Sequence, residues 1–237
     1  MGMPELLIEI KAAANTAIAR SGRGVVALIL KDDTQTTDSF TYAKMNAVVK
    51  SHWTSANYDY LQKTFDGSPA RVIVERIGAT NGDATEALAR LKNKKWNYLA
   101  FPGADEDEVT EIAAWIKNCR SDGQSFKAVL PSTAADHEGI INFATEDIVV
   151  GKKTYTTTEY CCRIAGILAG TNLDNSATYT VLSEVSSIKE STDPDADVDA
   201  GKLILIHDGE HVKLGRAVNS LKTISTGKTA DMKKIKI

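Results

Sequence analysis

Residues 57–77, NYDYLQKTFDGSPARVIVERI, predict a helix that runs directly into a buried strand. The apolar residues that recur at helical spacing are Tyr58, Leu61 and Phe65. They lie on one helical stripe, and the β-branched run at 72–74 is typical of a buried strand. Gly67 is expected to end the helix, and Pro69 to keep it from resuming. The stretch carries no nucleophile, base or ligand cluster, so the unit that decides the fold has no evident chemistry of its own.

The same alternation of helices and strands extends from residue 24 to about residue 130. Strands are expected at 24–31, 70–77, 96–102 and 126–130. Helical segments are expected at 42–50, 54–66, 83–93 and 105–120. Strands that alternate with helices form a mostly parallel central sheet covered by helices. The fold class is therefore predicted to be α/β.

Sequence signals at two helix starts support these boundaries. Asp83 and Glu86 have the spacing of a capping pair. Residues 105–108 are all carboxylates, and negative charge is favourable at the start of a helix. The expected buried face of that second helix is Val109, Ile112, Ala113, Ile116 and Cys119.

After Pro131 the chain changes to shorter elements, which predict a smaller β-rich part. Strands are expected at 139–143, 147–150 and 153–156, followed by a largely buried helix near 157–170 that contains Ile164, Ile167 and Leu168. Residues 172–201 include ESTDPDADVDAG and are expected to be mainly a solvated acidic loop. A hairpin should then turn at Asp208 and Gly209, with further strand after it.

The first 22 residues are expected to form an N-terminal arm with a single strand. That strand comprises Glu5, Leu6, Leu7, Ile8, Glu9 and Ile10. A strand without a hairpin partner needs another edge, either in its own sheet or in a neighbouring molecule. We therefore expect an arm at 1–22, an α/β core at 23–172, and an acidic loop with a β-rich segment at 173–237. The chain finishes TADMKKIKI without a cap or turn signal, so more protein is expected to follow.

Composition narrows the class of protein. The 237 residues carry a net charge of −3 with scattered Lys and Arg, so no nucleic-acid partner is expected. Three cysteines, two of them adjacent, cannot form a disulfide framework and indicate a reduced, cytosolic protein. No apolar run approaches the roughly 20 residues that span a bilayer. Glu5 precedes the first apolar run without a basic leader, so we expect a soluble protein without a signal peptide or a membrane partner.

Two histidine arrangements have residue types that could carry chemistry. His207 and His211 flank the hairpin turn and could bind a metal if they shared a face, but no third ligand stands at a fixed spacing. Exposed hairpin histidines are favoured instead. His137, with Asp136 and Ser132, has the composition of a hydrolase triad. The G-x-S-x-G elbow is absent from the sequence, so a solvated loop is favoured there.

The other motif fragments are incomplete. Residues 226–229, TGKT, imitate the end of a phosphate-binding loop, but Lys222 stands where the motif needs glycine. Cys161 and Cys162 lack C-x-x-C spacing, and we expect one in the core and the other exposed or facing a partner. Residues 193–199 lack the glycine and the closing glutamate of a calcium loop. We therefore expect no cofactor and no metal.

Several segments, taken in order, resemble contractile phage tail sheath proteins. The first group reads GVVALILKDD (24–33), SFTYAKMNAVV (39–49), YDYLQKTFDG (58–67) and ARVIVERI (70–77). The later group lies in DAGKLILIHDGEHVKLGRAVNSLKTIS (199–225) and includes Gly215, Arg216, Val218, Asn219, Ser220 and Leu221. The chain is most similar to the shorter sheath proteins of Gram-positive phages, prophages and phage-tail-like bacteriocins.

This resemblance implies a structural, non-enzymatic subunit of a helical tube that surrounds an inner tail tube and contracts to drive it through a target cell envelope. It implies a core similar to subtilisin without the catalytic residues, arms that exchange strands with neighbours, and a C-terminal domain beyond this chain. The implied partners are other sheath subunits, the inner tube protein, the baseplate and the tail terminator. The implied location is a virion tail or phage-tail-like particle assembled in the bacterial host cytoplasm.

The alternative interpretation is an α/β enzyme or small-molecule-binding protein with a pocket at the carboxyl ends of its parallel strands. The polar candidates at those ends are Asp32, Asp33, Arg76, residues 102–105 and Ser132. A third interpretation is a baseplate or tube protein of a contractile system, although tube proteins are expected to be shorter and rich in β-structure.

Overall fold

The computed structural model describes residues 22–80 and 82–223, and a seven-stranded sheet forms its centre. The strand order is β10-β6-β5-β4-β1-β3-β2. These strands are β1 (Val25–Lys31), β2 (Ser39–Tyr42), β3 (Arg71–Ile77), β4 (Tyr98–Ala100), β5 (Lys127–Pro131), β6 (Ile140–Phe143) and β10 (Lys202–Leu203). All neighbours pair in parallel except β2 with β3, so the predicted mostly parallel sheet is confirmed.

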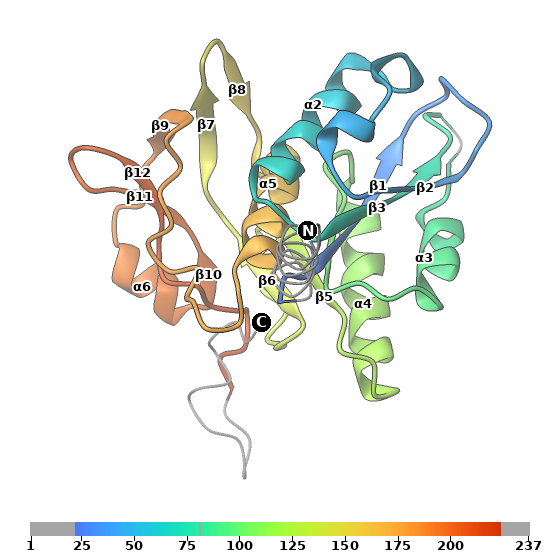
Figure 1. Cartoon of the computed structure of the whole chain (residues 1–237). Helices are drawn as coiled ribbons and strands as arrows, with labels where there is room; N and C mark the ends of the chain where they lie inside the picture. The colour runs from blue at the N-terminus through green and yellow to red at the C-terminus, as the bar shows by residue number, and fades with distance from the viewer. Residues whose placement is uncertain (1–21, 81, 224–237) are drawn as a thin grey trace, which may run out of the picture.

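Two helices cover each face of this sheet (Figure 1). One face carries α2 (Ser55–Asp66) and α5 (Thr157–Gly170), and the other carries α3 (Ala84–Lys92) and α4 (Glu106–Ser121). Successive residues of β1 enter opposite cores, with Val26, Leu28 and Leu30 in the first and Ala27 and Ile29 in the second. Because both faces are buried, β1 is apolar without interruption, as expected of a parallel strand. The buried face of α4 is the predicted one.

Glycines allow α2 and α5 to cross with their backbones in contact. A Cβ at Gly166 would overlap the backbone carbonyl of Thr64, and a Cβ at Gly170 would overlap the carbonyl of Gly67. Gly67 ends α2 as predicted, but its φ of −79° is an ordinary helical value. The left-handed residue of the turn is Ser68, with a φ of 59°. Glycine is therefore required at position 67 because a side chain would not fit there, and not because the backbone has an unusual conformation.

This close crossing changes the buried face of α2 from the predicted stripe. Leu61 is buried as expected, whereas Tyr58 and Phe65 lie half-buried at the border of the core. The buried residues of α2 are Asn57, Tyr60, Leu61 and Thr64. A small side chain at position 64 lets the two helices approach, and the ring of Phe65 would not fit there.

The predicted helix at 42–50 was wrong. The segment contains the end of β2 and two short 3-10 turns, η1 (Met45–Ala47) and η2 (Lys50–His52). Phe40 and Tyr42 point the same way along β2, and their rings stack with centroids 6.0 Å apart. Pairing of β2 with β3 therefore outweighs the short helical pattern, because a strand at the open edge buries these rings.

The chain after β6 forms the smaller β-rich part, which lies beside the β6 and β10 edge of the central sheet (Figure 1). Its elements are β7 (Glu146–Val150), β8 (Lys153–Tyr155), β9 (Val185–Lys189), α6 (Pro194–Asp199), β11 (Leu205–His207) and β12 (Val212–Leu214). The β11–β12 hairpin is confirmed, and Gly209 in its turn has a φ of 98°. Sequence reasoning missed β9 and α6, because β9 is an edge strand with exposed serines and α6 is a short acidic helix.

Two strands from after residue 172 pair with strands from before it. β9 pairs with β7, and β10 pairs with β6. The division into folding units at residue 172 stays a prediction. The further strand expected after the hairpin does not form among residues 215–223.

Candidate functional site

The carboxyl end of the central sheet, where an enzyme would have its pocket, is organised around the buried carboxylate of Asp32. Its Oδ1 accepts hydrogen bonds from the Thr34 amide at 2.8 Å and the Thr34 hydroxyl at 2.5 Å. Its Oδ2 accepts from the Thr54 amide at 2.9 Å and from Asn57 Nδ2 at 2.7 Å. Burial raises the pKa of this carboxyl, but the hydrogen bonds outweigh burial and leave the pKa below its usual value. Asp32 therefore joins the end of β1 to the start of α2.

Arg76, near the end of β3, is also used in packing. Its guanidinium lies over the rings of Phe40 and Trp53, 5.1 and 4.9 Å from their centroids. Burial lowers the pKa of Arg76, and the charge of Asp32 opposes that shift. The arginine therefore fills the space between two aromatic rings at the sheet edge.

The remaining candidates at this end have local structural roles. Asp33 accepts a hydrogen bond from the Ala79 amide at 2.9 Å. Asp105 and Glu108 form a reciprocal capping box at the start of α4. Ser132 is exposed with a φ of 45°. Two open grooves, of about 300 and 630 Å³, are lined by other residues of the described chain.

The hydrolase-triad candidates instead hold the late segment of the chain. The Asp136 carboxylate accepts hydrogen bonds from the amides of Lys222 at 2.5 Å and Thr223 at 2.9 Å, and from the Thr223 hydroxyl at 2.5 Å. These hydrogen bonds lower the pKa of Asp136 to about 2. Nδ1 of His137 accepts from the Gly139 amide at 3.0 Å. Asp136 is thus directed at the late segment and not at a catalytic imidazole.

Ser220 makes further contacts to the same loop. Its hydroxyl donates to the His137 carbonyl at 3.0 Å, and its amide donates to the Ile140 carbonyl at 2.8 Å. We call Asp136, His137 and residues 219–223 the clasp. The clasp fixes the end of the β-rich part to the start of β6.

The family-like residues predicted from the sequence lie in and beside this clasp. Val218, Asn219, Ser220 and Leu221 are buried, whereas Arg216 is exposed. Gly215 donates its amide to the Ile204 carbonyl at 2.8 Å, and a Cβ at Gly215 would lie only 2.9 Å from that oxygen. A close backbone approach therefore requires glycine at 215. A role for these residues in assembly stays a prediction.

Removing the Asp136 carboxylate should loosen the clasp. Asp136→Ala is expected to raise amide hydrogen exchange at Lys222 and Thr223 about tenfold, because one carboxylate accepts both amides. In the unaltered protein this protection should persist down to about pH 3 and be lost as the pH falls through the lowered pKa of about 2. Asp174→Ala, in an exposed loop, is the matched control. Equal exchange rates in both variants would rule out this role for Asp136.

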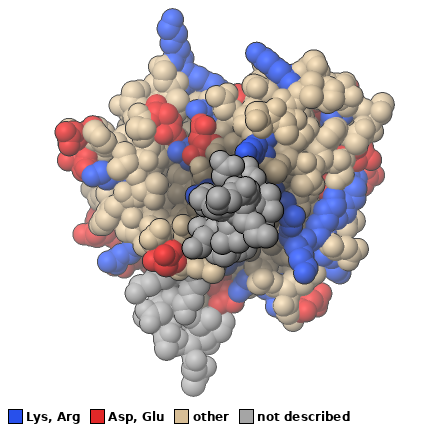
Figure 2. All heavy atoms as spheres, in the orientation of Figure 1, with Lys and Arg blue, Asp and Glu red and all other residues tan. Residues whose placement is uncertain are grey.

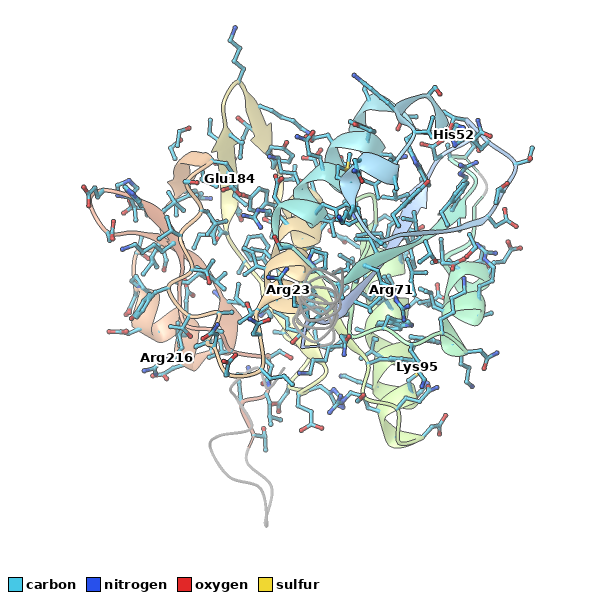
Figure 3. All side chains as sticks on the ribbon, in the orientation of Figure 1. Arg23, His52, Arg71, Lys95, Glu184 and Arg216 are labelled. Atoms are coloured by element: carbon cyan, nitrogen blue, oxygen red, sulfur yellow. The ribbon has the colours of Figure 1, made fainter. Side chains whose placement is uncertain are left out.

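A second polar contact ties α5 to the β-rich part. Arg163 Nε donates to Glu184 Oε1 at 2.6 Å, and the Tyr160 hydroxyl donates to the same oxygen at 3.2 Å (Figure 3 labels Glu184). The Arg163 and Glu184 side chains are 7% and 22% exposed. Burial raises the pKa of Glu184, but the hydrogen bond and charge of Arg163 outweigh it, so the pKa lies below its usual value. The pair is therefore charged at neutral pH.

Tyrosine–carboxylate contacts join α2 to α5 and to β8. The Tyr60 hydroxyl donates to Glu159 at 2.7 Å, and the Tyr155 hydroxyl donates to Asp59 at 2.7 Å. Lys153 Nζ also donates to Asp59, at 2.9 Å. Burial, followed by these carboxylates, raises the pKa of Tyr60 and of Tyr155 far above the usual value. Both tyrosines therefore remain protonated donors.

The remaining candidates from the sequence are the hairpin histidines, a metal site, a membrane span and two segments near the ends of the chain. His207 and His211 are exposed on the hairpin, as favoured. Within residues 22–80 and 82–223, no group of three or more His, Cys, Asp or Glu side chains could hold a metal ion. No helix in these ranges is long and apolar enough to cross a membrane. The TGKT sequence at 226–229 and the strand predicted at 5–10 lie outside the described residues.

The expectation that one of the paired cysteines is exposed was wrong. Cys161 and Cys162 are both buried. Every residue from Tyr160 to Ala169 is buried, because α5 lies between the central sheet, α2 and the β-rich part. Burial raises the pKa of Cys162 to about 12, so its thiol is not a nucleophile at neutral pH.

Known proteins resemble this chain in sequence. The sequence profile of the phage tail sheath protein central domain matches residues 78–220. The chain is also 35% identical, over its whole length, to the tail sheath protein of Clostridium phage phiCD119, and the match covers 68% of that protein. This chain belongs to the phage tail sheath protein family. Sheath proteins are structural, which agrees with the use of Asp32, Arg76 and Asp136 in capping and packing.

Solved sheath structures share the fold of this sheath chain. The crystal structure of a sheath tail protein from Desulfitobacterium hafniense matches with a TM-score of 0.80 and 15% identity, covering 92% of this chain and 76% of that one. The anti-feeding prophage helical sheath in its contracted state matches with a TM-score of 0.65 and 11% identity, covering 87% and 64%. The mostly parallel sheet with helices on both faces is therefore the fold of sheath proteins.

Proposed function

We propose that this sheath chain polymerises with copies of itself around an inner tail tube and contracts to drive that tube through a target cell envelope. The observation that carries the proposal is the 35% identity to a tail sheath protein over the whole chain. The anti-feeding prophage neighbour forms a helical sheath that has a contracted state, and we propose the same behaviour here. The proposed partners also include the inner tube protein, the baseplate and the tail terminator, in a particle assembled in the host cytoplasm.

The packing of the described residues supports this mechanical role. Contraction requires rigid subunits that have two alternative packings against their neighbours. The glycine crossing of α2 and α5, the clasp and the Arg163–Glu184 pair stiffen the body of the subunit. Such a subunit can exchange one set of contacts with neighbouring subunits for another without changing its own fold.

The N-terminal arm is proposed to link neighbouring subunits. Its predicted strand at 5–10 would add to a sheet edge of another copy, and small residues at 12–14 and 21–24 would form a flexible tether. These residues lie outside the described part of the chain, apart from 22–24. The expected division into arm, core and later β-rich segment belongs to the same proposal.

Electron microscopy tests the proposed function directly. The protein, expressed alone and together with its neighbouring tail proteins, is expected to form tubes or stacked rings in negative stain. Contracted and extended tubes of different diameter would support contraction. A monodisperse monomer whose melting temperature rises with a small ligand would contradict the proposal and favour the α/β enzyme.

Deleting residues 2–20 tests the arm separately. The deletion is expected to abolish tubes while leaving the melting temperature within about 3 °C of the intact chain, because short terminal arms add little to the stability of a core. The measurements are negative-stain microscopy and calorimetry. Tubes that still form and contract without residues 2–20 would rule out the tether role.

A further inference from the structure

The amino ends of the parallel strands carry a basic groove. It has a volume of about 630 Å³ and is lined by Arg71, Lys92, Lys94 and Lys95 around the ring of Trp96. Lys94 pairs with the buried carboxylate of Glu75. Figure 2 shows Lys and Arg atoms gathered over the region where Figure 3 labels Arg71 and Lys95.

Three cations of this groove form no ion pair with the described residues. Arg71, Lys92 and Lys95 are exposed and make no ion pair with the residues of 22–80 and 82–223. Asp122, at the end of α4, is a carboxylate at the same end of the sheet. The positive charge of this end is therefore available to another molecule.

The opposite end of the strands is acidic. Its exposed carboxylates include Asp33, Asp38, Asp83, Glu86, Asp105, Glu106 and Asp107. Of the cations at this end, Lys31 pairs with Glu108 at 2.8 Å and Arg76 is buried under two aromatic rings. Lys50 is exposed and lies over the ring of Tyr58, 5.6 Å from its centroid. The strand direction therefore runs from a basic end to an acidic end of the molecule.

Helix dipoles explain only part of this polarity. Every helix that follows a parallel strand starts at the acidic end, where carboxylates cap it, and α3 ends near Lys92 at the basic end. Arg71 and Lys95 belong to no helix, however, and neither do Asp33 and Asp38. Charged residues outside the helices therefore add to both the basic end and the acidic end of the molecule.

We propose that copies of this chain contact one another head to tail along the strand direction, with the basic groove of one copy against the acidic end of the next. The partner is a second copy because a single chain presents both complementary surfaces. A contact between two different surfaces repeats without closing into a dimer, and so generates rings or helical filaments. This contact deepens the proposed sheath function and rests on it.

Exposed charge pairs make the contact weak and dependent on salt. Each exposed pair stabilises an interface only slightly and is screened as ionic strength rises. Weak pairs can separate and re-form while subunits are held by other links. The contact therefore suits a lattice whose neighbours rearrange.

Charge exchange between two variants provides the test. Arg71→Glu/Lys95→Glu reverses two charges of the basic groove, and Glu106→Lys/Asp107→Lys reverses two charges of the acidic end. Each variant alone is expected to lose assembly about tenfold, measured as pelleted protein and as tubes at low salt, because like charges oppose each other. An equal mixture of the two is expected to assemble again, since opposite ends then alternate. Lys152→Glu/Lys189→Glu changes the charge equally at other exposed sites and should assemble normally.

The outcomes distinguish this contact from the proposed function. Arg71→Gln/Lys95→Gln provides a milder variant, and melting curves check that every variant folds. If the unaltered protein assembles and the mixture recovers nothing, or each reversed variant assembles alone as well as the unaltered protein, the head-to-tail contact is wrong and the sheath function stands. If the unaltered protein never assembles, both proposals fail.

Discussion

Gly166→Ala is expected to lower the free energy of unfolding by about 3 kcal/mol, the upper range for overpacking a core. The direction is opposite to the usual effect, since replacing glycine by alanine within a helix normally stabilises it by about 1 kcal/mol. The reason is the crossing of α2 and α5, where the new methyl group would overlap the Thr64 carbonyl. Urea denaturation monitored by circular dichroism measures the change.

Gly103→Ala is the matched control for that substitution. A Cβ at Gly103 would meet only Phe101 Cε2, at 3.8 Å, which is ordinary van der Waals contact. Its free energy of unfolding should change by less than about 0.5 kcal/mol, as for other surface substitutions. A Gly166→Ala variant as stable as Gly103→Ala would show that the two helices do not cross at backbone contact.

Arg163→Leu is expected to destabilise the protein by about 3 kcal/mol at neutral pH, because it leaves the Glu184 carboxylate largely buried without its cation. Arg163→Leu/Glu184→Met removes both charges and should recover most of the loss, since an apolar pair of similar size can replace a buried ion pair. Chemical denaturation of both variants provides the measurement. A double variant less stable than the single one would contradict this account.

The pH dependence of the Arg163→Leu effect has a defined sign. In the unaltered protein the pKa of Glu184 is lowered by folding, so its contribution is present above the unfolded pKa and is lost as the pH falls through the folded pKa. In Arg163→Leu only burial remains, which raises the folded pKa, so acidification stabilises the variant relative to pH 7. The difference between the two proteins should therefore shrink from neutral pH towards about pH 4. A difference that grows over this range would contradict the assignment.

The central sheet could be predicted because its signals are local. The continuous apolar run of β1 and the capping carboxylate at Asp105 each fix an element from a few neighbouring residues. The resemblance to sheath proteins depended on the order of such segments, and the match to residues 78–220 confirms it.

The contacts between distant elements could not be predicted in the same way. Gly166 and Gly170 have the four-residue spacing of a close helix contact, but the sequence of α5 does not identify α2 as the helix that it contacts. Asp136 stands beside His137 in a segment where the sequence favours a solvated loop, whereas its hydrogen-bond partners, Lys222 and Thr223, are more than 80 residues away. The paired cysteines were misjudged because the enclosure of α5 comes from the whole fold.

The short passage from β10 to β11 has a mechanical consequence. Ile204 alone separates the two strands, so the chain leaves the central sheet and enters the hairpin without slack. The Leu205 amide donates to Thr145 Oγ1 at 2.7 Å, and the Ala144 amide donates to the Leu203 carbonyl at 3.1 Å, which locks this passage on both sides. Force on the hairpin would reach the central sheet as shear along β10 and β6, a direction in which neighbouring hydrogen bonds share the load. The β-rich part is therefore connected rigidly to the central sheet and not through a flexible linker.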